Sequence, residues 1–108
     1  CINHSIADEM CPINQAYKRD LFEWCACRDG GEINIYEYFM GVNFYLSLTM
    51  IHHELMFDEI DFYHQNKVEG LLTQFDPSHW GVYGINYCAM AQAGYGTDKQ
   101  QFLTKIFT

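Results

Sequence analysis

The chain has 108 residues, of which 49% are hydrophobic and 17% aromatic, so it is long enough to bury one core and is not of disordered composition. No apolar run reaches the ~20 residues that a transmembrane helix needs. The formal net charge is −8, and residues 29–66 contain no Lys or Arg. This charge disfavours nucleic acid and anionic membranes as partners and favours a cation or a basic protein segment, or it simply marks a solvated acidic surface.

Apolar residues recur mostly at helical spacing, which predicts an all-α protein with strands only as short pairings between loops. The first helix is expected over residues 10–25 and stops at Asp29-Gly30-Gly31. The pattern resumes from Tyr36 to Met50 and again from Ile51 to Ile60, where His64-Gln65-Asn66-Lys67 breaks it. Asn66 tolerates the left-handed backbone of such a turn. A short helix through Leu71, Leu72 and Phe75 follows.

Two further helices are predicted in a C-terminal extension over residues 80–107. The first covers about residues 80–93 and stops at Gly94-Tyr95-Gly96. Thr97 and Gln100 have the spacing of a capping box, so Thr97 is expected to begin the last helix. We expect residues 1–108 to form a single domain.

Residues 26–37 read Ala-Cys-Arg-Asp-Gly-Gly-Glu-Ile-Asn-Ile-Tyr-Glu. On a 12-residue calcium loop, Gly31 takes the sixth place, Ile33 the eighth and Glu37 the twelfth, which holds the bidentate carboxylate. Together with the following Tyr38 and Phe39, this segment resembles the loops of the EF-hand superfamily. The resemblance implies that Ile33 packs into the core and pairs with a partner loop.

A fainter copy begins at Asp61, 35 residues after the first loop start at residue 26. It places Asn66 at the turn, Val68 at the core position and Glu69 at the ninth place. The resemblance spans residues 8–76 and implies a degenerate, calmodulin- or light-chain-like pair of helix–loop–helix units. Ile33 and Val68 are then expected to pair between the two loops.

Both loops lack most calcium ligands, because a calcium site needs several oxygen ligands and a first-place aspartate is seldom dispensable. The ligand places without a carboxylate hold Ala26, Arg28, Gly30, Tyr63, Gln65 and Leu72. The vestigial positions that remain are Asn34, Glu37, Asp61 and Glu69. We therefore expect no cofactor and no calcium binding at cellular concentrations. The alternative is an unorthodox calcium or magnesium sensor that uses Asp29, Glu32 and backbone carbonyls.

Other chemistry has weaker support. His52-His53-Glu54 suggests zinc, but a His-Glu-x-x-His motif would need histidine where Phe57 stands, so surface or partly buried histidines are the simpler interpretation. Nothing assembles an acid, a base and a nucleophile, so we expect no enzyme. The odd cysteine count leaves at least one unpaired thiol and favours the cytoplasm, with a secreted, effector-like helical protein as the alternative. The cysteines are Cys1, Cys11, Cys25, Cys27 and Cys88.

The predicted function is a non-catalytic regulatory or structural module that binds a basic amphipathic helix, from a partner or from its own parent chain, without calcium. A groove rich in Met and aromatic residues is the expected binding surface. The simpler interpretation is that these residues are core. The candidate groove residues are Phe39, Met40, Met50, Met56, Phe57 and Phe75.

Overall fold

The computed structural model describes residues 4–39, 51–74 and 80–108. This part of the chain is mostly helical, as predicted, and adds a small parallel sheet of two strands. None of its helices has the length and apolar character needed to cross a membrane. In chain order the elements are α1 (Pro12–Cys27), β1 (Asn34–Glu37), α3 (His53–Gln65), β2 (Gly70–Thr73), α4 (Trp80–Gly94) and α5 (Lys99–Phe107).

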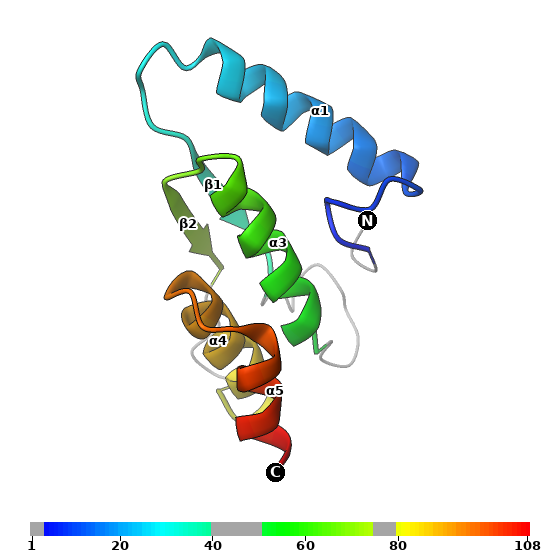
Figure 1. The fold of residues 1–108 in the computed structure, drawn as a ribbon, viewed down its shortest axis with the longest axis vertical. Helices are drawn as coiled ribbons and strands as arrows, with labels where there is room; N and C mark the ends of the chain where they lie inside the picture. The colour runs from blue at the N-terminus through cyan, green and yellow to red at the C-terminus, as the bar shows by residue number, and fades with distance from the viewer. Residues whose placement is uncertain (1–3, 40–50, 75–79) are drawn as a thin grey trace.

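Helix α3 lies in the middle of the molecule, with β1 and β2 side by side along it (Figure 1). Helices α4 and α5 pack at one end, where the chain ends, and α1 lies across the other end. The arrangement therefore has two ends, each of which uses a different part of α3.

The sheet corrects two predictions. β1 and β2 pair in parallel, with Ile35 opposite Leu71 and Tyr36 opposite Leu72, so Tyr36 begins no helix and residues 70–73 form a strand instead of a helix. Parallel neighbours need a crossover connection, and here it contains α3. A strand fits because Leu71 packs inward while Leu72 is 63% exposed, an alternation of period two. The helix expected over residues 40–50 lies outside the described residues.

Gly70 leaves room for a side chain on the neighbouring strand. A Cβ atom on Gly70 would lie 2.0 Å from Oδ1 of Asn34, its register partner on β1. The Asn34 side chain can lie over residue 70 because this residue has no side chain.

The predicted start of the second calcium-type loop is wrong. α3 continues to Gln65, so residues 61–65 are helical and Asp61 begins no loop. Its carboxylate instead accepts a hydrogen bond of 2.7 Å from Gln65, one helical turn further on. The left-handed residue that ends the helix is Lys67, with φ of 59°, whereas Asn66 has φ of −95°.

The other helix ends are close to their predicted places. α1 stops where Asp29 and Gly30 take φ of 43° and 81°, a region that glycine enters without strain. The helix predicted over residues 80–93 is confirmed as α4. The capping residue of α5 is Asp98, which accepts a 2.9 Å hydrogen bond from the Gln101 amide, so the assignment to Thr97 was wrong by one position.

Two apolar clusters hold the fold, and Leu71 packs against both. The first cluster joins α3 to α4 and α5, and the rings of Phe57 and Phe102 lie 5.0 Å apart in it. The second joins the other half of α3 to α1, the N-terminal segment and the loops. The buried members of the first are Phe39, Met56, Phe57, Tyr83, Ala89 and Phe102, and those of the second are Ile6, Leu21, Phe62 and Tyr63.

Polar contacts add to the apolar packing of Leu21 in holding helix α1. Nδ2 of the buried Asn14 donates to the carbonyl oxygens of His4 and Ser5 at 2.7 and 2.9 Å. After the helix, Arg28 Nη1 donates to the Lys67 carbonyl at 2.8 Å and lies 3.1 Å from Oε1 of Glu69. These bonds fix α1 at both of its ends, and they leave much of its apolar surface uncovered.

Candidate functional site

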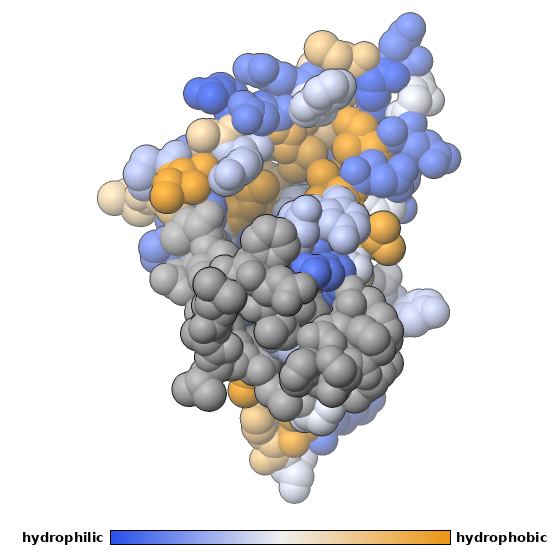
Figure 2. Space-filling model, turned by 180° about the vertical axis from the view of Figure 1, so that it is seen from behind, coloured by the Kyte–Doolittle hydropathy of each residue, from blue (hydrophilic) through white to orange (hydrophobic). Residues whose placement is uncertain are grey.

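A groove of about 600 Å³ lies between α1 and the layer formed by β1 and α3. Tyr17 and Trp24 line it from α1, and they are 62% and 71% exposed. The two residues are seven positions apart, which places them on one face of the helix. Hydrophobic side chains gather beside α1 in the space-filling view, bordered by hydrophilic ones (Figure 2). The apolar residues of the opposite wall are Ile33, Ile35, Phe39 and Leu55.

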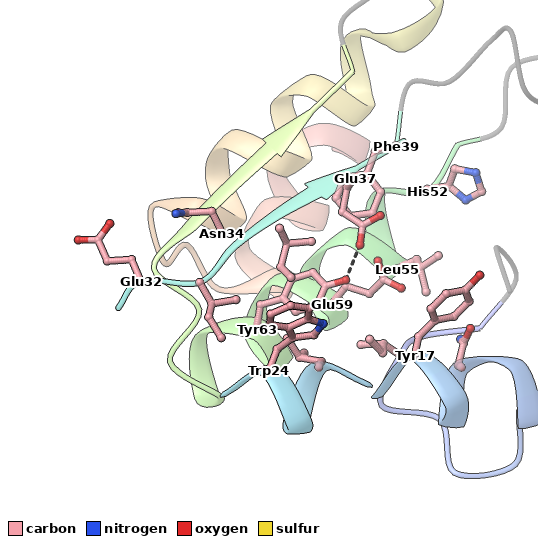
Figure 3. Close-up of a pocket in the computed structure, with 15 residues that line it drawn as sticks. Tyr17, Trp24, Glu32, Asn34, Glu37, Phe39, His52, Leu55, Glu59 and Tyr63 are labelled. Carbon is pink, nitrogen blue, oxygen red and sulfur yellow. Dashed lines mark hydrogen bonds between the residues drawn. The ribbon is translucent and has the colours of Figure 1, made fainter. Parts of the chain in front are cut away.

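Two acids and a tyrosine occupy the floor of this groove. Glu37 comes from β1, and Glu59 and Tyr63 come from successive turns of α3 (Figure 3). The Tyr63 hydroxyl donates a hydrogen bond to Oε1 of Glu37. This bond ties the end of the Tyr63 side chain on α3 to the Glu37 carboxyl group on β1.

Glu59 is only 9% exposed, and burial together with the nearby Glu37 charge raises its pKa to about 8. Near neutral pH, Glu59 therefore holds a proton. Burial also raises the pKa of Tyr63, with Glu37 acting in the same direction, so this phenol stays neutral and remains a donor. The floor then carries one negative charge and one proton that a cation could displace.

The four vestigial loop positions do not converge on one ion site. Glu37 lies on the groove floor, and Asp61 accepts the hydrogen bond from Gln65 on the surface of α3. Asn34 packs against Gly70 between the strands. Glu69 accepts a 2.9 Å hydrogen bond from the Ile33 amide and pairs with Arg28. Within residues 4–39, 51–74 and 80–108, no group of three or more His, Cys, Asp or Glu side chains could hold a metal ion.

The six residues predicted to bind a partner separate into two groups. Phe39, Met56 and Phe57 are at most 6% exposed and belong to the core cluster with residues of α4 and α5. The prediction that these three side chains form an open partner groove is therefore wrong. Of these three, Phe39 also lines the observed groove. Met40, Met50 and Phe75 lie outside the described residues.

Sequence reasoning missed Glu59, Tyr63 and the exposed side chains of Tyr17 and Trp24 as site residues. One signal was available, because Glu59 is three or four positions from Met56, Phe62 and Tyr63, which are buried on the same face of α3. Tyr17 and Trp24 belong to the apolar spacing that predicts the helix over residues 10–25. Nothing in the local pattern distinguishes a face that is covered from one that borders a groove.

His52 and His53 are half-buried, as the interpretation of surface or partly buried histidines predicted, and they border a second hollow next to the N-terminal segment. His52 precedes α3 and lines both hollows, and burial lowers its pKa. His53 has its Nε2 3.9 Å from Oε1 of Glu54. The cysteines at positions 11, 25, 27 and 88 are free thiols.

Comparison of the chain with protein-family models, with curated proteins and with solved structures finds no match.

Proposed function

We propose that this protein is a non-catalytic binding module that takes a basic amphipathic helix into the groove between α1 and the β1–α3 layer, without needing calcium. The observation that supports it best is the pair of exposed aromatic side chains, Tyr17 and Trp24, facing a floor that contains Glu37 and Glu59. Aromatic residues of this kind are the usual anchors of protein interfaces.

Charge complementarity selects the class of partner. The described residues that line the groove include Glu32, Glu37 and Glu59 but neither Lys nor Arg. With a net charge of −8, the chain attracts basic segments at long range, while apolar burial supplies most of the affinity. An amphipathic helix with Lys on one face and Leu on the other meets both requirements.

The EF-hand-like scaffold stays a prediction. Its support is that Ile33 and Val68 pack against the same cluster and that the Glu69 amide donates to the Ile33 carbonyl at 2.9 Å. The helical Asp61 and the parallel pairing of β1 with β2 count against it. The proposed binding function depends on the groove and is independent of this family assignment.

The test is titration of the protein into a fluorescently labelled synthetic helix with leucines on one face and lysines on the other. Trp24→Ala should weaken binding at least about tenfold, as removal of an interface anchor does. Tyr95→Ala is the matched control, because Tyr95 is 89% exposed and lies outside the groove. Equal affinity of wild type and Trp24→Ala would reject the groove as the binding site.

Calcium separates this proposal from the unorthodox sensor. Peptide affinity should be the same in millimolar calcium and in chelator, and the melting temperature should shift by about a degree or less, since a ligand stabilises a fold by RT ln(1 + [L]/Kd). A shift of many degrees that Glu37→Gln abolishes would favour the sensor.

A further inference from the structure

We infer that the ligand of this groove inserts a lysine side chain whose ammonium group lies against the carboxyl groups of Glu37 and Glu59. The inference rests on the proposed function and names the group that the site recognises. It follows from the position of the two carboxyl groups at the floor of an apolar groove (Figure 3).

The shape and lining of the groove favour an alkylammonium ligand. A lysine side chain has an apolar stem that packs along apolar walls and a compact charge at its tip. Leu21, Trp24 and Ile35 are apolar residues of the groove lining that can pack along such a stem. The Trp24 ring can also attract a cation through its face.

The hydrogen bonds of the two acids favour lysine over arginine. One oxygen of Glu37 accepts from Tyr63, and the Glu59 carboxyl receives a backbone hydrogen bond from Ile6. A guanidinium group binds best to a carboxylate that has both oxygens available. An ammonium group needs only single acceptors, which the two partly engaged carboxyl groups still provide.

The charges at the groove floor predict that binding of the lysine releases the proton held by Glu59. Among the described residues, the groups that act on Glu59 are Glu37 from β1, Tyr63 and Asp58 from α3, and the Ile6 amide from the N-terminal segment. Helix α1 faces the groove with Tyr17 but with no charged residue, and His52 borders it as a base weakened by burial. An ammonium ion beside Glu59 favours its carboxylate form, so the proton passes to solvent while the lysine keeps its own.

The test uses two synthetic amphipathic helices that differ only in the central residue of the apolar face, which is lysine in one and norleucine in the other. Norleucine has a similar apolar stem without the ammonium group. At pH 8 the lysine peptide should bind wild type at least about tenfold more tightly. Its affinity should rise from pH 6 to pH 8 by up to about tenfold per unit and then level off, because Glu59 titrates at about 8.

Two further measurements complete the experiment. Glu59→Gln should reduce the lysine preference and remove the pH dependence, while Glu54→Gln, an exposed acid on the same helix, should retain both at their wild-type size. Calorimetry of wild type in two buffers of different ionisation enthalpy should show up to about one proton released per lysine peptide at pH 7 and fewer for norleucine.

The results separate failure of the lysine site from failure of the proposed function. Equal or tighter binding of the norleucine peptide at pH 8 would overturn the lysine site and leave the proposed helix-binding function intact. A lysine preference of wild-type size in Glu59→Gln, or lysine binding to wild type that releases no proton, would also overturn it. If neither peptide binds wild type, the proposed function and this inference fail together.

Discussion

The two ends of the molecule use similar apolar side chains in opposite ways. At the α4–α5 end, Met56 is fully buried and Phe102 is 3% exposed. At the α1 end, Tyr17 and Trp24 are 62% and 71% exposed, and Met10 before the helix is 88% exposed. The contrast shows that the apolar content of a helix does not determine its burial. Burial depends on whether another element lies against that face.

The contacts that hold the helices to α3 also differ between the two ends. Asn86, fully buried on α4, accepts a 3.0 Å hydrogen bond from the His52 amide at the start of α3, and Lys99 on α5 pairs with Asp58 at 2.9 Å. These bonds supplement a packed core. At the other end, the polar contacts of Asn14 and Arg28 hold α1 with less apolar burial beside them. We therefore call the α4–α5 end the structural half, and the α1 end, which contains the proposed binding groove, the binding half.

The largest effect is expected from truncating a methionine in the structural half. Met56→Ala removes a fully buried side chain and should lower the free energy of unfolding by about 2–5 kcal/mol, measured by denaturant titration. Met10→Ala is the matched control at the other end and should stay within about 0.5 kcal/mol of wild type. Similar losses in the two variants would show that the ends do not differ in packing.

The groove floor should make stability depend on pH. Because the pKa of Glu59 is about 8 in the folded protein and lower when unfolded, the folded state holds the extra proton between these values. The stabilisation that comes from this proton is fully present below the unfolded-state pKa of Glu59, and it is lost as the pH rises through 8. Glu59→Gln should therefore stabilise the protein at pH 8 by roughly 1–3 kcal/mol and have little effect near pH 4, by thermal melts. A gain of equal size at both pH values would contradict the assigned proton.

The contact between Arg28 and Glu69 should matter moderately, because it ties the end of α1 to the start of β2. Arg28→Ala leaves the Lys67 carbonyl and Glu69 without this donor. We expect the free energy of unfolding to fall by about 1 kcal/mol. Hydrogen exchange should quicken in α1 more than in α4. Arg19→Ala is the control, since this side chain is 68% exposed and should change stability by less than about 0.5 kcal/mol. Uniformly faster exchange would instead indicate one cooperative unit.

The smallest effect on stability should come from the binding half itself. Trp24→Ala removes a side chain that is 71% exposed, so the free energy of unfolding should change by about 0.5 kcal/mol or less, even though peptide affinity falls. A loss above about 2 kcal/mol in denaturant titration would assign Trp24 to the core and remove it from the binding surface.

The sequence by itself determined where most of the helices lie. Apolar spacing near 3.6 residues predicted α1, α3 and α4, and the Asp29-Gly30 stop depends only on local backbone preferences. The acidic character of the chain follows from composition alone. These features are local, because a few neighbouring residues contain all the information that fixes them.

Tertiary structure decided which apolar faces are covered and which acids meet. Leu71 and Leu72 suit either a helix or a strand, and pairing with β1 selects the strand. Periodicity places Met56 and Trp24 each on an apolar face, but only the position of α4 and α5 buries one and leaves the other beside a groove. Glu37 and Glu59 meet because the crossover from β1 brings α3 back along the strand, and no local signal encodes an approach between residues so far apart in the chain.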